Sequence, residues 1–262
     1  MSRDENSCAN GEHASAVTRR DNVPIVVPPV RLTNRKVGGS KGGRETRLQR
    51  SFFARYTPTV ARELVGCRLV MMNRGRRLSG RIVETEAYRG SGDPASHAYP
   101  GRTNRNAVMF GEAGHAYVFF TMGMHYCLNV TTETPGTPGA VLLWAIEPVE
   151  GVRRMLRNRG LGTAVHVADG PGRLTEALGV DRSLNGVDMV NSKILFVEKG
   201  TRPKRIGRSS RVGITVATDR QWRYFIEGNK FVSRGKPSDL AHRIHNYAKT
   251  GRRVVGSSAS LV

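Results

Sequence analysis

The spacing of apolar and polar residues predicts a chain in which strands outnumber helices. Apolar side chains at period two, rich in β-branched and aromatic types, indicate strands. The strands expected on this basis lie at 67–72, 78–88, 141–146, 194–197, 212–217 and 222–226. Because strands and helices do not alternate regularly along the chain, the pattern predicts one α+β domain rather than repeated βαβ units.

Proline and glycine mark where the expected helices begin and end. Thr57-Pro58, an N-cap followed by a first-turn proline, opens a helix over 58–65. Asp169-Gly170-Pro171 opens another helix, which Gly179 closes. A third, basic helix is expected over 149–159.

The most apolar run of the chain, 116–130, predicts a β-hairpin because Gly123 divides it near its middle. The residues of this run that we expect in the core are Val118, Phe120 and Leu128. Met122 and Met124 would then flank the glycine at the tip. Apolar side chains on an exposed tip are suited to insertion between stacked bases.

Both ends of the chain are expected to be disordered tails, at 1–50 and 241–262, around a folded domain at 51–240. The first tail holds few large apolar residues and much Gly, Ser, Asn and Arg. Such a segment cannot bury enough surface to offset the entropy lost on ordering. Basic residues concentrate toward the C-terminus, where 199–262 carries 15 Lys and Arg against 3 acidic residues.

The charge of the whole chain changes the range of partners to consider. Its 262 residues carry 42 Lys and Arg against 21 Asp and Glu, a net charge of +21. This excess argues against a neutral metabolic enzyme and favours a polyanionic partner, either nucleic acid or an anionic membrane surface. No apolar run approaches the roughly 18 residues that span a bilayer. The three distant cysteines, Cys8, Cys67 and Cys127, fit a reducing compartment rather than a disulfide framework.

The strand expected over 78–88 carries the most unusual chemistry. Side chains at period two place Ile82, Glu84, Glu86 and Tyr88 on one face. The simplest interpretation is an edge strand whose glutamates pair with some of the many cations. The sharper interpretation is a general base, because a carboxylate beside nucleic acid must be held there against phosphate repulsion.

The stretch 89–114 is expected to be a long loop, and loops of this length in compact domains are usually functional. It contains His97, which alone would more often be a surface or structural residue. Arg102 and Arg105 belong to a basic polar turn suited to phosphate contact. The His and Cys residues show no metal-ligand spacing, and the chain has neither a P-loop nor a GxSxG nucleophile motif.

Several segments, taken in chain order, resemble the alkyladenine (3-methyladenine) DNA glycosylase family. They cover roughly 52–233, nearly the whole expected domain. They are GRIVETEAY at 80–88, His97, Arg105-Asn106, the run from Tyr117 through Met122-Gly123-Met124 to Asn129-Val130, VLL at 141–143 with AIEP at 145–148, GPGRL at 170–174 and RVGI at 211–214.

The resemblance implies a mixed α+β fold with a curved, largely antiparallel sheet and a protruding hairpin that inserts into DNA. It implies a monofunctional enzyme that flips alkylated or deaminated purines (3-methyladenine, hypoxanthine and ethenoadenine types) out of duplex DNA. The enzyme would hydrolyse the N-glycosidic bond without metal or cofactor. We therefore expect damaged double-stranded DNA as partner, no membrane association and a monomer, in the nucleus of a eukaryote or the cytoplasm and nucleoid of a prokaryote.

The resemblance also assigns roles to individual residues. Glu86 would activate the water that attacks C1′ of the flipped nucleotide. Tyr88 and His97 would stack on one face of the base and Phe119, where the family has tyrosine, on the other, while Asn129 would disfavour guanine. Met122 would wedge into the vacated stack. The residues expected to contact DNA around it are Arg102, Arg105, Thr121 and Gly123.

Trp144 departs from the family, which commonly carries arginine at this position of the base pocket to help hold the water. An indole donates one N–H and has no charge. A non-catalytic basic DNA- or RNA-binding protein is therefore the alternative interpretation, and a membrane-surface role ranks third. The two carboxylates of 84–86 distinguish the first two interpretations, because a pure binder has no reason to hold acids in a polyanion site.

Overall fold

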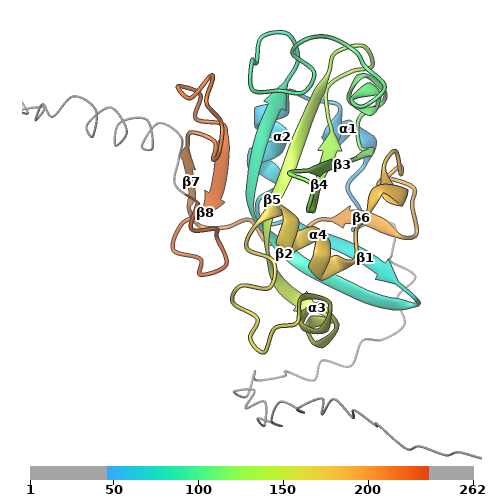
Figure 1. Cartoon of the computed structure of the whole chain (residues 1–262), viewed down its shortest axis with the longest axis vertical. Coiled ribbons are helices and arrows are strands. Elements are labelled where there is room, and N and C mark those ends of the chain that lie inside the picture. The colour runs from blue at the N-terminus through green and yellow to red at the C-terminus, as the bar shows by residue number, and fades with distance from the viewer. Residues whose placement is uncertain (1–45, 236–262) are drawn as a thin grey trace, which may run out of the picture. The chain divides into compact units, whose positions relative to one another are not determined.

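A computed structural model describes residues 46–235 of the chain and confirms an α+β domain built on an antiparallel sheet (Figure 1). The main strands are ordered β3-β4-β5-β2-β1-β6, and β8 pairs with both β2 and β7. The strands span Arg68–Asn73 (β1), Arg76–Arg89 (β2), Ala116–Thr121 (β3), His125–Thr131 (β4), Gly139–Glu150 (β5), Leu195–Glu198 (β6), Ile206–Ser209 (β7) and Arg223–Ile226 (β8).

Four α-helices and two short 3₁₀ turns accompany the sheet in the described residues. They span Arg50–Phe53 (α1), Thr57–Leu64 (α2), Ala107–Phe110 (η1), Val152–Arg159 (α3), Pro171–Leu178 (α4) and Arg182–Leu184 (η2). Helices α2 and α4 have proline in their first turn, and Gly179 ends α4 in the left-handed conformation, as the sequence predicts. Helix α3 begins three residues later than expected, because Val149 and Glu150 extend β5.

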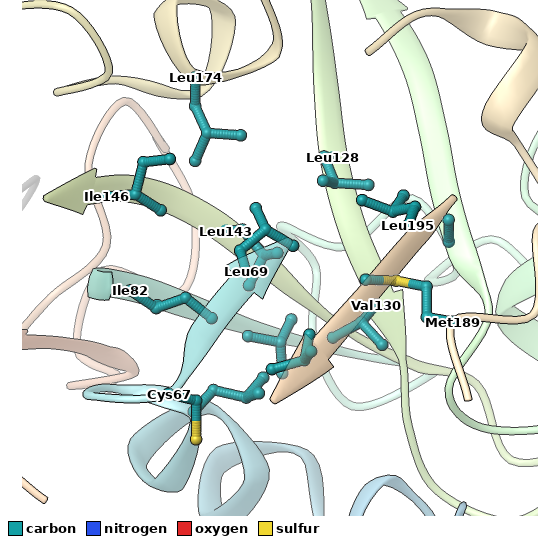
Figure 2. Packing of buried hydrophobic residues seen from close by; sticks show 14 of the residues in the cluster. Cys67, Leu69, Ile82, Leu128, Val130, Leu143, Ile146, Leu174, Met189 and Leu195 are labelled. Carbon is teal, nitrogen blue, oxygen red and sulfur yellow. The ribbon is translucent and has the colours of Figure 1, made fainter. Parts of the chain in front are cut away.

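One large apolar core fills the curl of the sheet (Figure 2). Strand residues such as Leu69, Ile82 and Leu143 pack there with Leu128 of β4. Helices α2 and α4 add side chains to the same core, among them Leu174. The hairpin of β3 and β4 is therefore anchored at its base in the core and free only toward its tip.

A pair of bulges interrupts the central pairing of β2 with β5. Val83 is the extra residue on β2, and Trp144 is the extra residue on β5, so the register is restored after both. Ile82 consequently faces the main core, whereas Val83 belongs to a small separate cluster. The expectation that Ile82 shares a face with the two glutamates is therefore wrong, because a bulge shifts the period-two alternation.

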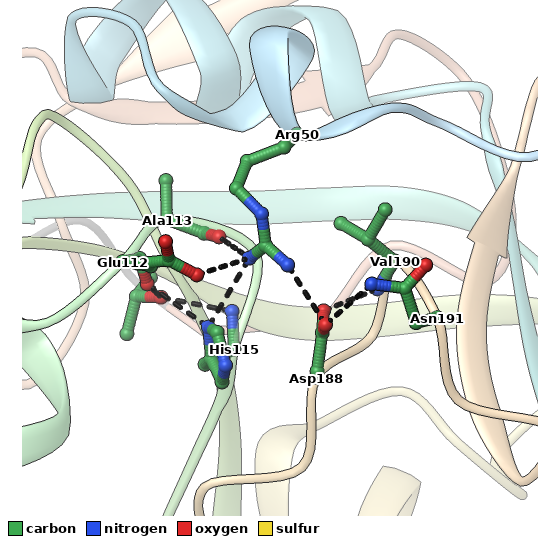
Figure 3. A network of polar contacts seen from close by, with 8 residues as sticks. Arg50, Glu112, Ala113, His115, Asp188, Val190 and Asn191 are labelled. Atoms are coloured by element: carbon green, nitrogen blue, oxygen red, sulfur yellow. Dashed lines mark hydrogen bonds and ion pairs between the residues drawn. The ribbon is translucent and has the colours of Figure 1, made fainter.

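The domain begins before residue 51, the expected boundary. Arg47 bridges to Glu198, and Leu48 is buried in the core. Arg50, at the start of α1, donates from Nη1 to the Ala113 carbonyl at 2.6 Å and from Nη2 to Asp188 Oδ2 at 2.7 Å (Figure 3). These contacts hold residues that composition alone assigns to a tail. Residues 1–45 and the tail expected at 241–262 lie outside the described residues.

Two further expectations about the sheet and the hairpin are wrong. The segment 212–217 forms an irregular loop rather than a strand, with a bridge residue only at Val212, whose backbone N–H donates to the buried Glu86 carboxylate of β2. The strand β7 was not expected, since its short sequence IGRS contains one apolar residue. Phe120 is 48% exposed rather than in the core, whereas Val118 and Leu128 are buried as expected.

Candidate active site

A cavity of about 330 Å³ opens at the side of the hairpin. Its walls come from the end of β2, the loop after it, strands β3 to β5, the start of α4 and the loop 212–214. Seven of the residues singled out in the sequence line it: Tyr88, His97, Phe119, Thr121, Met122, Asn129 and Trp144. The antiparallel pairing of β2, β5, β4 and β3 brings these seven residues, from Tyr88 to Trp144, to one concave site.

Glu86 lies behind this cavity rather than in its wall. Its carboxylate is fully buried and accepts hydrogen bonds from Val212 N–H, at 2.7 Å, and from Tyr88 Oη, at 2.8 Å. Both donors line the cavity themselves. Burial raises the pKa of the Glu86 carboxyl from 4.5 to about 8, although the two hydrogen bonds act in the opposite direction. A carboxyl group with a pKa near neutrality can gain or lose a proton under physiological conditions.

Glu84 is equally buried, two residues earlier on β2, but its surroundings are different. Arg223 of β8 donates from Nε to Glu84 Oε1 at 2.7 Å. Ser233 donates to the same carboxylate from its backbone N–H, at 2.7 Å, and from its hydroxyl, at 2.9 Å. Glu84 is thus a fully paired anion that ties β2 to β8 and to the residues after it. It does not line the cavity.

A second buried ion pair holds the two loops that flank Tyr88. Arg211 binds Asp93 through both terminal nitrogens, at 2.6 and 2.8 Å, and neither side chain is exposed. Arg211 also donates to the Ala87 carbonyl at 3.0 Å, and its guanidinium lies 4.6 Å from the Tyr88 ring centre. Because Asp93 precedes His97 in one loop and Arg211 precedes Val212 in the other, this pair fixes both loops against β2. Sequence reasoning gave neither residue a role, although Arg211 begins the RVGI motif.

The aromatic wall of the cavity is formed by residues that contact one another. The rings of His97 and Phe119 meet edge to face, with their centres 4.5 Å apart. His97 Nδ1 lies 2.9 Å from the hydroxyl of Tyr117, which sequence reasoning left without a role. The signal for Tyr117 was its position two residues before Phe119 on the same strand face. Burial, together with the nearby Arg105, lowers the pKa of His97, so its ring is mainly neutral at pH 7.

The two remaining pocket residues lie on neighbouring strands. Asn129 of β4 is buried and donates from Nδ2 to the Tyr117 carbonyl at 3.1 Å. Trp144, at the β5 bulge, is half-buried and contacts the small cluster of Val83, Ala145 and Phe231 while it lines the cavity. The indole thus closes one side of the pocket as packed apolar surface.

The hairpin tip exposes its apolar side chains. Met122 is 82% exposed and Met124 is 67% exposed. The turn is closed by a hydrogen bond from Met124 N–H to the Thr121 carbonyl, at 3.2 Å, and both residues between them have positive φ. Gly123 has open space around its Cα, so nothing shields the tip.

Two of the residues expected to contact DNA, Arg102 and Arg105, lie on the loop that follows His97. Arg105 is exposed, and its guanidinium lies 5.5 Å from the ring centre of Phe119, at the back of the aromatic wall. Arg102 is exposed on the same loop, but it does not line the cavity. The loop itself is ordered by Asn106, whose amide donates to the His97 carbonyl at 2.8 Å and to the Gly101 carbonyl at 2.9 Å.

The described part of the chain contains no group of three or more His, Cys, Asp or Glu side chains placed to hold a metal ion. Of the helices between residues 46 and 235, none has the length and apolar character needed to cross a bilayer. Cys67 and Cys127 are both buried free thiols, and burial raises the pKa of each to about 11.

Comparison with known proteins identifies this arrangement. The sequence pattern of the family described as methylpurine-DNA glycosylase matches residues 51–230. A protein of Carboxydothermus hydrogenoformans named "Putative 3-methyladenine DNA glycosylase" is 46% identical over 189 residues, which are 71% of this chain and 98% of the relative. A protein of the same name from Methanoculleus marisnigri is 44% identical over 191 residues, again 71% of this chain and 98% of the relative. The chain therefore belongs to the methylpurine-DNA glycosylase family, the DNA-repair enzymes that cleave the N-glycosidic bond of alkylated bases.

Proposed function

We propose that this enzyme removes alkylated and deaminated purines, of the 3-methyladenine, hypoxanthine and ethenoadenine types, from duplex DNA by base flipping and hydrolysis. The observation that carries the proposal is the position of Glu86. It is a buried carboxyl group whose pKa is raised to about 8, directly behind an aromatic cavity of about 330 Å³. Cavities of this size accept a purine, and buried carboxyl groups of this pKa serve as general bases.

Flipping comes first, because a base inside the duplex is out of reach. Met122 is the side chain best placed to fill the gap that the flipped nucleotide leaves, since it is the most exposed apolar residue of the tip. The sequence predicts His97 and Phe119 on opposite faces of the base, but their rings touch each other. We therefore propose that the flipped base stacks between Tyr88 and this pair. Stacking on such a wall contributes on the order of 1–3 kcal/mol per base.

The chemical step assigned to Glu86 is proton removal from a water molecule as its oxygen attacks C1′. The C1′–N bond breaks, its electron pair leaves with the purine, and the water proton passes to the Glu86 carboxylate. Glu86 must be ionised for this step, and the Val212 N–H and the Tyr88 hydroxyl stabilise the ionised form. Each oxygen accepts one of these bonds and keeps a second acceptor site, but the carboxylate is fully buried. Lesion binding therefore has to open a path by which water reaches it.

Trp144 limits how the water can be held. The buried cation Arg211 is bound to Asp93 and to the Ala87 carbonyl, so it is not free to replace the arginine common in the family. We propose that Glu86 and the backbone of the 212–214 loop hold the water, and that Trp144 contributes apolar packing around the sugar. Trp144→Arg is then expected to leave the single-turnover rate unchanged or to raise it.

The experiment that tests the function is base release from a panel of duplexes, each with one 3-methyladenine, hypoxanthine or ethenoadenine. The enzyme should convert lesion sites into alkali-labile abasic sites, while matched undamaged duplexes stay intact. Release from none of the lesions, with tight binding to all of the duplexes, would favour a non-catalytic DNA-binding protein and overturn the proposal.

A further inference from the structure

Four arginines gather at the end of β2 opposite to Glu86. Arg76, Arg153, Arg154 and Arg157 line an open cavity of about 450 Å³ where the start of β2 meets helix α3. Arg76 is ten residues before Glu86 on β2, which is up to about 33 Å along an extended strand at 3.3 Å per residue. This arginine cluster is therefore separate from the base cavity, and none of its residues lines that cavity.

These guanidinium groups have no acidic partner in the described part of the chain. Within residues 46–235, none of the four lies within 4.0 Å of a carboxylate. By contrast, Arg68, Arg77 and Arg159 each form an ion pair with a glutamate. The acids at this end of the sheet are already occupied: Glu150 by Arg77 at 2.7 Å, and Glu198 by the same arginine at 2.6 Å.

The sequence of α3 places like charges side by side. Arg153 and Arg157 are four residues apart on the helix, and Arg154 and Arg157 are three apart, so they are neighbours on its surface. Like charges at these spacings destabilise a helix. A cluster that is unfavourable for folding and unpaired within the described domain is instead complementary to a bound polyanion.

We propose that the arginine cluster is a second binding site for the phosphodiester backbone of duplex DNA, used independently of the base cavity. The proposal rests on the function proposed above. Guanidinium groups bind phosphate oxygens in a bidentate manner and remain charged at every physiological pH. The cavity wall offers only Leu78 and Val152 as large apolar side chains, so it suits a charged backbone better than a membrane or an apolar peptide. A second site lets the protein hold DNA backbone without a base in its pocket.

The test compares two double variants of the full chain that remove the same charge. Arg153→Gln with Arg157→Gln removes two unpaired cations. The control, Arg55→Gln with Arg205→Gln, removes two exposed arginines that are each paired with a glutamate, Glu63 and Glu227. Affinity for an undamaged 30-base-pair duplex is measured across a range of salt concentrations. The slope of log K against log[salt] should become shallower by about 2 in the cluster variant and by much less in the control.

Further measurements separate this proposal from its alternatives. Equal slopes for the two variants would overturn it. A second result would also overturn it: the parent binds inorganic tripolyphosphate, the cluster variant does not, and both bind DNA with the same affinity. The site would then bind small polyphosphates rather than DNA. Because the readout is binding of undamaged DNA, it does not depend on base release. Unchanged thermal melting of both variants excludes misfolding, and Arg76→Gln with Arg154→Gln should repeat the shallower slope.

Discussion

Glu84 and Glu86 are the same residue type, two positions apart on one strand, and both are fully buried, yet their carboxylates have different partners. Glu84 has a permanent cation at 2.7 Å and two donors from Ser233. Glu86 has only two uncharged donors, Val212 N–H and the Tyr88 hydroxyl. Glu84 thus has a direct ion pair, whereas Glu86 has none among the described residues, and burial raises the pKa of Glu86.

The difference follows from what each flanking segment contributes. At Glu84 the neighbouring strand β8 places Arg223 directly against the carboxylate. At Glu86, Arg211 binds Asp93 instead, and its backbone neighbour Val212 donates to the carboxylate. Glu86, the residue to which we assign proton transfer, therefore has no direct ion pair within the described residues.

The largest expected effect is on catalysis by Glu86→Gln. The amide keeps the size and most hydrogen bonds of the carboxyl group but cannot take a proton, so the single-turnover rate should fall by on the order of 10²-fold or more. Binding of lesion DNA should be equal or tighter, because a negative charge near phosphate is removed. Substantial base release by this variant would remove Glu86 from the mechanism.

Glu84→Gln should show the opposite pattern, with a loss of stability and little change in rate. It leaves the buried guanidinium of Arg223 without its counter-charge, and breaking a buried pair typically costs about 3–5 kcal/mol. Urea unfolding measures the loss. Combining it with Arg223→Met should restore part of the stability, since no charge is then left unpaired. If Glu84→Gln were stable but inactive, the two roles would have to be exchanged.

The pH dependence sharpens the same contrast. Glu86 acts ionised and its pKa in the free protein is raised to about 8, so kcat/KM should rise about tenfold per pH unit up to about pH 8 and then level off. Stability should change in the opposite direction. The folded protein holds this proton more tightly than the unfolded chain, so the free energy of unfolding falls as the pH rises from about 4.5 to about 8. Glu86→Gln should abolish this part of the pH dependence of stability.

The smallest expected effect is that of Met122→Ala, about tenfold or less and dependent on the substrate. Loss of the wedge should slow release from a stably paired lesion and spare release from a mismatched or single-stranded one, where flipping costs little. Single-turnover assays on paired and mismatched hypoxanthine duplexes measure the difference. Equal losses on both would assign Met122 a role other than wedging.

Much of the fold was predictable because its boundaries are chemically explicit. Pro58 and Pro171 begin helices, and Gly123 turns the hairpin. The bulges at Val83 and Trp144 were not predictable, because the period-two pattern continues through them while the pairing shifts. The segment 212–217, rich in β-branched residues, has strand propensity, but it forms a loop whose first backbone N–H donates to Glu86.

The candidate site likewise has a part that the sequence predicts and a part that it does not. A resemblance of motifs was sufficient to select the cavity-lining residues, but not to place Glu86 behind the wall or to find what holds the wall in place. The Arg211–Asp93 and Arg223–Glu84 pairs join residues more than one hundred positions apart, and single-sequence patterns carry no information on such pairing. Tyr117 was likewise visible only as one aromatic among several, until its hydroxyl was found beside His97.

The backbone conformation of Met122 lowers the stability of the folded protein. Its φ of 52° is left-handed, a conformation that costs a residue with a side chain roughly 1–2 kcal/mol and costs glycine almost nothing. A Met122→Gly enzyme should therefore have a more relaxed turn and a blunt tip. Selection for thermostability alone would favour replacing this side chain, so engineering of a more stable enzyme should hold position 122 fixed and seek stability elsewhere.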